Sequence, residues 1–117
     1  MKHTVLLVED EEDLRELMRD ALEAHGYEVV AARDGREALA VIPRIGHLCV
    51  VLLDLLMPTM NGWDFYAAMR ARPELAKIPV VIHTSAPEKA PQGVTRVLAK
   101  PTRIDQLFAI VAELCGE

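Results

Sequence analysis

Five polar side chains stand where apolar segments of the sequence end. Glu9 and Asp10 follow the segment TVLLV, and Asp54 follows LCVVLL. Thr84 closes the segment PVVIHT, and Lys100 comes directly after VTRVLA. Short apolar runs bounded by polar residues are typical of buried strands. If these strands belong to one parallel sheet, their carboxyl ends bring three carboxylates, a hydroxyl and an ammonium group to one edge.

This set of groups predicts a specific chemistry. Three carboxylates held together repel one another by about 4 kcal/mol per pair at 4 Å and an effective dielectric constant near 20. A divalent cation relieves that repulsion, and oxygen ligands without histidine or cysteine suit Mg²⁺. A lysine and a threonine offer charge and a hydrogen bond to a phosphoryl group, and a carboxylate can be the nucleophile. The set therefore predicts Mg²⁺-dependent phosphorylation of an aspartate.

Each residue also has an ordinary structural explanation. Glu9 and Asp10 could simply begin a solvated helix, where acidic groups favour the helix dipole. Thr84 alone is more often a strand-end residue, and Lys100 alone is more often a surface charge. Asp54 is harder to explain by solvation, because it ends a six-residue apolar run. The functional interpretation depends on the coincidence of all five at successive strand ends.

The elements that must position these residues alternate along the chain. Short apolar runs predict strands, and apolar residues at helical spacing predict the helices between them. Helix-length connections between strands favour right-handed βαβ units. We therefore expect an α/β fold with a doubly wound parallel sheet of five strands and helices on both faces. The predicted strands are residues 4–8, 28–32, 48–54, 79–84 and 94–99, and the predicted helices are residues 12–25, 35–42, 63–71 and 102–115.

Capping residues mark two of the predicted helix starts. Asp34 with Glu37 three residues later forms a capping-box pattern, and Thr102 is the predicted cap of the last helix. The segment SAPEKAPQG, residues 85–93, contains Pro87 and Pro91. These prolines leave room for about one helical turn between the last two strands.

The charge of the chain is local. Its 117 residues include 18 acidic and 13 basic side chains, for a net charge of −5, and five of the acids are consecutive at residues 9–13. The rest of the chain is balanced, so it offers no basic face for nucleic acid. A hydrophobic fraction of 51% excludes a disordered acidic tail. We expect one domain spanning residues 1–117.

Cytoplasmic residence is the default expectation for this sequence. The longest apolar run is too short to span a membrane, and the first residues lack the pattern of a signal peptide. Cys49 and Cys115 lie in apolar stretches. Buried free thiols are expected there rather than a disulfide, and two isolated cysteines make no zinc site.

Taken together, these residues resemble the receiver domain of two-component response regulators, the CheY-like family, in its single-domain form. The resemblance covers essentially the whole chain. It depends on VLLVEDE, on D-x-x-M-P-x-M-x-G from Asp54 to Gly62, on Thr84-Ser85 and on Lys100-Pro101. It implies a flavodoxin-like sheet with strand order 2-1-3-4-5.

The resemblance implies a role for each acidic residue. Asp54 would accept a phosphoryl group from the phosphohistidine of a sensor histidine kinase or phosphotransfer protein. Asp10, Asp54 and the backbone carbonyl of Leu56 would bind Mg²⁺ directly, and Glu9 would act through water. Such a protein is not a conventional enzyme, but it catalyses its own phosphorylation and autodephosphorylation, and it switches binding to a downstream partner.

The resemblance also implies roles for the hydroxyl and the lysine. Thr84 and Lys100 would contact phosphoryl oxygens, and Ser85 would offer its backbone N–H. The Lys100–Pro101 peptide bond would be cis, which X–Pro bonds tolerate.

Three departures from the family pattern concern signalling. The switch position, three residues before the lysine, holds Val97 where the family has an aromatic residue. The interval between Thr84 and Lys100 is shorter than usual, so the fourth helix is expected to be shortened or missing. Leu56 and Ala86 occupy positions that tune dephosphorylation, and two apolar side chains there predict a longer-lived phosphoryl group.

Three other functions compete with the receiver. A pseudo-receiver, which binds partners without phosphorylation, is favoured by Val97 and the short interval but opposed by the intact polar set. A haloacid-dehalogenase-like phosphatase needs an acid two residues after the nucleophile, where this chain has Leu56. A flavodoxin needs a phosphate-binding loop after the first strand, where this chain is acidic.

Overall fold

A computed structural model describes residues 3–116 as a five-stranded parallel sheet in the order β2-β1-β3-β4-β5. The predicted fold class and strand order are therefore confirmed. The sequence forms these strands where its apolar runs are bounded by turns and acids. The strands are β1 (Thr4–Val8), β2 (Glu28–Ala32), β3 (Leu48–Leu53), β4 (Val80–Thr84) and β5 (Arg96–Ala99).

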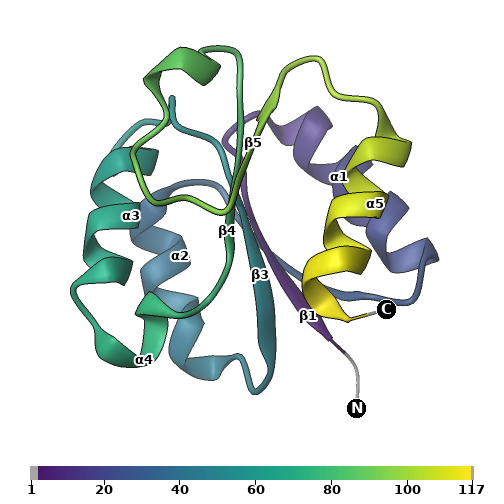
Figure 1. The fold of residues 1–117 in the computed structure, drawn as a ribbon. Helices are drawn as coiled ribbons and strands as arrows, with labels where there is room; N and C mark the ends of the chain where they lie inside the picture. Colours follow the sequence, from purple (N-terminus) through teal and green to yellow (C-terminus); the bar gives the residue numbers. More distant parts are fainter. Residues whose placement is uncertain (1–2, 117) are drawn as a thin grey trace.

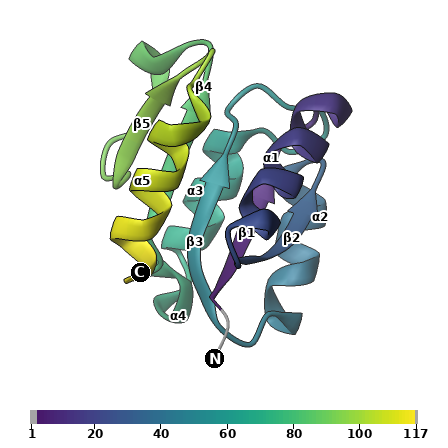
Figure 2. The same ribbon diagram turned by 90° about the vertical axis from the view of Figure 1, so that its right-hand side faces the viewer.

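Helices cover both faces of the sheet. Helices α1 (Glu12–Ala24) and α5 (Ile104–Cys115) lie on one face, and α2 (Gly35–Val41) and α3 (Gly62–Arg70) lie on the other (Figures 1 and 2). A short helix, α4 (Pro73–Ala76), follows α3 directly. Two 3₁₀ turns, η1 (Ile42–Arg44) and η2 (Pro87–Lys89), complete the elements of the described residues. None of the helices in residues 3–116 combines the length and the apolar character needed to cross a membrane.

The sheet separates two apolar cores. Side chains alternate along β1, so that Val5 and Leu7 pack under α1 and α5 while Leu6 and Val8 pack under α2 and α3. Both β1 and β4 are buried at every position. This double burial explains why the strands read as continuous apolar runs, and it leaves their carboxyl ends as the natural place for polar groups.

The connection between β4 and β5 contains no α-helix. Its one regular element is the 3₁₀ turn η2, with Pro87 at its first position. The expectation of a shortened or missing helix is therefore confirmed. If the turn continued as an α-helix, the N–H of residue 91 would donate to the carbonyl of residue 87, and Pro91 lacks that N–H.

Local predictions at two helix starts had different outcomes. Asp34 does cap α2, because its side chain accepts a hydrogen bond from the Glu37 N–H at 2.8 Å. Thr102 does not cap α5, and that prediction was wrong: the capping position is Arg103, and the Thr102 hydroxyl donates to the carbonyl of Ala99 at 2.8 Å. The Thr102 hydroxyl is therefore hydrogen-bonded within the turn after β5 and does not contact the first turn of α5.

The expectation of free thiols was also wrong. Cys49 and Cys115 form a disulfide, with their Cα atoms 5.3 Å apart. Cys49 lies near the start of β3, and Cys115 is the last residue of α5. The two positions are 66 residues apart in sequence, and their proximity comes from the packing of α5 against β3. Spacing along the chain gave no sign of this pairing.

Candidate functional site

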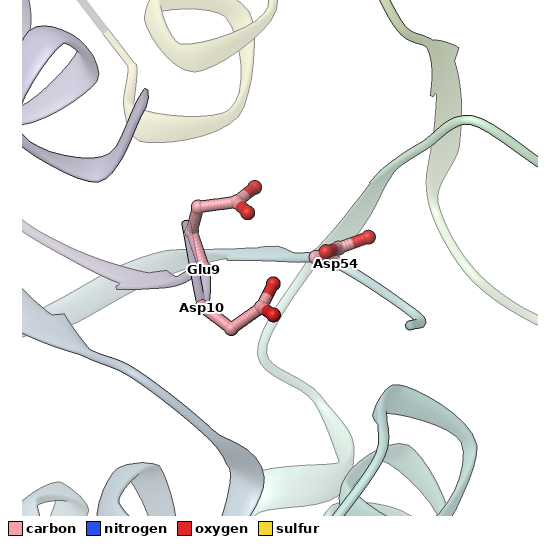
Figure 3. A group of neighbouring side chains, drawn as sticks. All are labelled: Glu9, Asp10 and Asp54. Carbon is pink, nitrogen blue, oxygen red and sulfur yellow. The ribbon is translucent and has the colours of Figure 1, made fainter. Parts of the chain in front are cut away.

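Three carboxylates meet at the carboxyl ends of β1 and β3. One carboxylate oxygen each from Glu9, Asp10 and Asp54 lies within 4.8 Å of the other two. Figure 3 shows Glu9 and Asp10 leaving the end of β1 on the side of the site that faces Asp54. Glu9 is only 1% exposed and Asp54 5%, whereas Asp10 is exposed. The predicted cluster is therefore present, with two buried members and one that faces solvent.

Lys100 links the two buried acids. Its Nζ lies 2.9 Å from Glu9 Oε1, to which it donates a hydrogen bond, and 3.5 Å from Asp54 Oδ2. The other Glu9 oxygen accepts from the backbone N–H of Glu11 at 3.2 Å. Both carboxylate oxygens of Glu9 are thus engaged inside the protein. This ion pair was not predicted, because the sequence showed only that Lys100 reaches the same edge of the sheet.

Burial dominates the electrostatics of the site. Burial raises the pKa of Glu9 above its ordinary value, although the hydrogen bond from Lys100 opposes the rise. Burial likewise raises the pKa of Asp54, against the charge of Lys100. For Lys100, burial lowers the pKa, but the hydrogen bond and charge of Glu9 and the charge of Asp54 outweigh it, so the pKa is raised. Burial therefore makes the ionised carboxylates of the site unfavourable in free energy, and a bound cation would reduce this penalty.

Backbone contacts fix where the two strands end. The N–H of Asp54 donates to the carbonyl of Val8 at 3.0 Å, which continues the pairing of β1 and β3 one residue beyond β3. From α1, the guanidinium of Arg15 donates to the carbonyl of Glu9 at 3.0 Å. Arg15 therefore ties the first acidic residue to the helix that follows it. Arg15 was not among the predicted site residues, although it lies near the start of the predicted helix at residues 12–25.

The loop after Asp54 is held tightly against the strand below it. A side chain at Gly62 would place its Cβ 2.5 Å from the Asp54 carbonyl oxygen and 2.7 Å from Leu55 Cα, so only glycine fits. Met57 is buried, and Met60 packs against the core. These contacts explain why the D-x-x-M-P-x-M-x-G motif has glycine and methionine at these positions. They also place Leu56 at the tip, 49% exposed, with its N–H 3.4 Å from Asp54 Oδ1.

Thr84 and Ser85 end β4 beside the same site. Thr84 is fully buried, and its hydroxyl accepts a hydrogen bond from the N–H of Ala86 at 3.1 Å. Its carbonyl accepts from the N–H of Lys100 at 2.8 Å, which joins β4 to the end of β5. Ser85 is exposed. The structure therefore brings Thr84 and Lys100 together through the backbone.

The remaining predicted positions lie at the end of β5. The Lys100–Pro101 peptide bond is cis, as the resemblance implies. Val97 is 40% exposed and leaves the switch position without an aromatic ring.

His83 follows Ile82, which packs under α2 and α3, so its side chain lies on the face of β4 covered by α1 and α5, and it is 6% exposed. Burial, with a contribution from the charge of Lys100, lowers its pKa to about 4, so it is a neutral strand residue.

The residues present fit a magnesium ion. Their donors are carboxylate oxygens, with no imidazole or thiolate among them, and the exposed Asp10 leaves a side open to solvent. Mg²⁺ retains several water ligands and binds through one or two carboxylates, which suits a half-open cluster of this kind. The ammonium of Lys100 lies on the buried side. The arrangement can bind a divalent cation and present Asp54 as a nucleophile next to a fixed positive charge.

A cavity of about 570 Å³ opens beside the site, between the start of α1 and the start of α5. Most of its lining is apolar, including Leu14, Met18 and Leu107, whereas Ser85 and Lys100 belong to the site itself. Leu17, 63% exposed, and Ile104, 41% exposed, belong to the same lining.

The chain matches proteins of one family along nearly its whole length. The family model described as the response regulator receiver domain matches residues 5–112. The polar-differentiation response regulator DivK of Brucella ovis is 29% identical, with 100% of this chain and 99% of DivK covered. The chemotaxis protein CheY4 of Vibrio cholerae has a similar structure, with a TM-score of 0.85, 30% identity and 97% and 99% coverage. Similar too is the response regulator TrrA of Thermotoga maritima in complex with Mg²⁺-BeF, with a TM-score of 0.83, 26% identity and 97% and 99% coverage. The chain belongs to the receiver domains of two-component response regulators.

Proposed function

We propose that Asp54 accepts a phosphoryl group from the phosphohistidine of a sensor histidine kinase or phosphotransfer protein. The observation that carries this proposal is the position of the Asp54 carboxylate, which is buried at the strand end, clustered with two further carboxylates and 3.5 Å from an ammonium group. An aspartate whose only role is solvation at the surface would not be buried next to other carboxylates and an ammonium group. We assign residues 1–117 to a single receiver domain.

In this proposal, Asp10, Asp54 and the backbone carbonyl of Leu56 would hold Mg²⁺, and Glu9 would contribute through a water molecule. When bound, the ion neutralises carboxylate charge and the charge of the incoming phosphoryl oxygens. Glu9 has a second task, because it holds Lys100 in place at 2.9 Å. The exposed Asp10 is the member of the cluster that solvent and ions reach first.

The residues of this chain supply the rest of the chemistry. An oxygen of Asp54 attacks phosphorus, the P–N bond to the donor histidine breaks, and the nitrogen retains that electron pair. Lys100 offers its charge to the phosphoryl oxygens, and Thr84 and the backbone N–H of Ser85 offer hydrogen bonds. Attack of water on phosphorus later returns Asp54 to its carboxylate form and releases inorganic phosphate. These steps make the chain a catalyst of its own modification.

The phosphodonor protein has a surface to dock on. The apolar cavity between α1 and α5 shares Ser85 and Lys100 with the site, so a partner that fills it is placed next to Asp54. Exposed Leu17 and Ile104 give that partner apolar area to bury. We place the protein in the cytoplasm with an unidentified downstream protein as its second partner. Direct binding to nucleic acid or membranes has no part in the proposal.

Titration with beryllofluoride, a phosphoryl mimic, in the presence of Mg²⁺ tests whether the site fills. The backbone amide resonances of Asp54–Leu56 should shift with saturation, and the fluorescence of Trp63, the single tryptophan of the chain, should change. Asp54→Asn should remove the response. Binding that is absent, or that does not depend on Mg²⁺, would refute the proposal and leave a pseudo-receiver that binds partners without phosphorylation.

A further inference from the structure

The cavity between α1 and α5 has the size and the lining of a small-molecule site. The two helices are neighbours on one face of the sheet (Figure 1), and the cavity between their first turns has a volume of about 570 Å³. Ligand pockets in proteins occupy roughly 300–1,000 Å³ and combine an apolar lining with a few polar groups that orient the ligand. Leu14, Met18 and Leu107 supply apolar surface here. The polar groups of the lining therefore indicate which molecule the cavity would bind.

The imidazole of His83 is the buried polar group of this lining. His83 lies one residue before the end of β4 and borders the cavity. Its side chain is 6% exposed, and its Nδ1 is buried with no hydrogen-bond partner within residues 3–116. A buried polar atom without a partner is unfavourable and uncommon in folded proteins. A ligand in the cavity can supply the hydrogen bond that the fold does not.

The charged groups of the lining do not favour an anionic ligand. The ammonium of Lys100 is already paired with the two buried acids of the carboxylate cluster. The guanidinium of Arg103 donates two hydrogen bonds to the Asp105 carboxylate, at 3.1 and 3.2 Å. Glu11 is exposed in the same lining and would repel an anion. An anionic ligand would therefore gain little from the cations and lose from the acid.

The protonation state of His83 determines which group pairs with it. Burial, with a contribution from the charge of Lys100, lowers the pKa of His83 to about 4, so the imidazole is neutral at neutral pH. A neutral imidazole has one N–H donor and one acceptor nitrogen. A hydroxyl group can donate or accept, so it pairs with either nitrogen, whereas the charge of Lys100 would repel an ammonium group. The thioether of Met18 favours contact with an aromatic ring.

We propose that the cavity between α1 and α5 binds a neutral aromatic molecule that carries a hydroxyl group. The ring lies among the leucine and methionine side chains of the lining, and the hydroxyl group is hydrogen-bonded to His83. This binding does not require a phosphoryl group on Asp54. The cavity shares Ser85 and Lys100 with the site, so a bound molecule would exclude a phosphodonor protein from it. That consequence alone rests on the proposed function.

Two probes of the same shape test the binding on the full chain without added metal. 4-Ethylphenol carries the hydroxyl group, and 4-ethyltoluene has a methyl group in its place. In a titration followed by nuclear magnetic resonance, both probes should shift the methyl resonances of Leu14, Met18 and Leu107. The two probes differ in hydrophobicity, so the informative quantity is the ratio of their dissociation constants and how a variant changes it.

His83→Leu replaces the imidazole with an apolar side chain. The dissociation constant of 4-ethylphenol should rise about 3- to 10-fold relative to that of 4-ethyltoluene, as expected for the loss of one hydrogen bond. His47→Leu is the matched control, because it removes an exposed imidazole just before the start of β3, at the other end of the sheet. In that variant the ratio should equal the wild-type ratio.

Three results would overturn the inference or part of it. Methyl resonances that respond to neither probe would overturn the cavity as a binding site. An unchanged ratio in His83→Leu, or an equal change in His47→Leu, would overturn the hydrogen bond to His83. Titration of the same samples with beryllofluoride and Mg²⁺ separates this inference from the proposed function. An Asp54 amide that responds without binding of 4-ethylphenol overturns the inference alone, and the reverse result overturns the proposed function alone.

Discussion

The ammonium group of Lys100 donates a hydrogen bond to the carboxylate of Glu9 across 91 residues of sequence, at 2.9 Å. The same ammonium lies 3.5 Å from Asp54, so one cation serves two buried acids. Its removal leaves two carboxylates facing each other with their pKa values already raised by burial. The lysine is therefore a structural residue of the resting site as well as the proposed partner of a phosphoryl group.

Replacement of Lys100 by methionine should destabilise the protein by about 2 kcal/mol at neutral pH, because a partly buried ion pair loses its cation. The pKa values of Glu9 and Asp54 rise further in this variant. When the pKa of a carboxyl group is raised in the folded state, the protein becomes less stable as the pH rises above the ordinary pKa of that group. The ordinary pKa is 4.5 for Glu9 and 3.8 for Asp54. The deficit should therefore be small near those values and grow toward pH 7.

Urea unfolding of the wild type and Lys100→Met between pH 4 and pH 7 measures this difference. The exposed Lys77 provides the control, since Lys77→Met removes a charge away from the site. A deficit that is the same at every pH would show that Lys100 acts through packing and not through the two carboxylates.

Magnesium should stabilise the protein by mass action. At a concentration of one hundred times its dissociation constant, the free energy of unfolding rises by about 2.7 kcal/mol. The gain should shrink in Asp10→Asn, because Asp10 is the exposed member of the carboxylate cluster. It should survive in Asp13→Asn, since Asp13 lies in the first turn of α1 and not in the cluster.

Thermal unfolding with and without Mg²⁺ gives the comparison directly. Asp10 and Asp13 belong to the same acidic run, so the two variants share the change in net charge and differ only in position. Equal loss of the magnesium effect in both would mean that the run attracts the ion as a diffuse charge.

Leu56 should prolong the lifetime of the phosphoryl group. Its side chain is 49% exposed beside Asp54, and an apolar group there offers no hydrogen bond to position an attacking water. Leu56→Asn should therefore release phosphate several-fold faster, as measured on phosphorylated protein after removal of the donor. Leu56→Met, which keeps the side chain apolar, should resemble the wild type. Identical rates in all three proteins would contradict the role of position 56.

Much of this site follows from the sequence because its strands are buried on both faces. A strand such as β3 carries apolar residues until it ends, so the first acid after it, Asp54, marks the carboxyl edge of the sheet. The order of such strands in one parallel sheet then brings their ends together. The acidic cluster, Thr84 and Lys100 could be predicted on this basis alone.

Contacts that depend on side-chain reach could not be predicted. The Glu9–Lys100 ion pair depends on the length of the glutamate side chain. The hydrogen bond that the Thr84 hydroxyl accepts from the Ala86 N–H depends on the turn that follows β4. Helix α4 begins at Pro73, two residues after the end of the predicted helix at residues 63–71, where no further helix was predicted. Prolines suit the first turn of a helix as well as its termination, so the residue alone does not decide.

The disulfide should contribute about 4 kcal/mol to stability by restricting the unfolded chain, given a separation of 66 residues. It joins the end of α5 to β3, far along the sheet from the acidic cluster. A dithiol reductant should therefore lower the urea midpoint of the wild type but not that of a Cys49→Ser/Cys115→Ser double variant. If the reductant frees both thiols and the urea midpoint of the wild type does not change, the disulfide has no stabilising role.

The most direct measurement of the central claim is transfer of a phosphoryl group from phosphoramidate, a small donor with a P–N bond like that of phosphohistidine. Intact mass spectrometry should show one added phosphoryl group in the presence of Mg²⁺ and none after chelation of the metal. Fragmentation should place the group on Asp54, and Asp54→Asn, which keeps the shape of the side chain, should remain unmodified. Modification of Asp54→Asn to the same extent, or no modification of the wild type with Mg²⁺, would contradict the assignment of Asp54 as the phosphoacceptor.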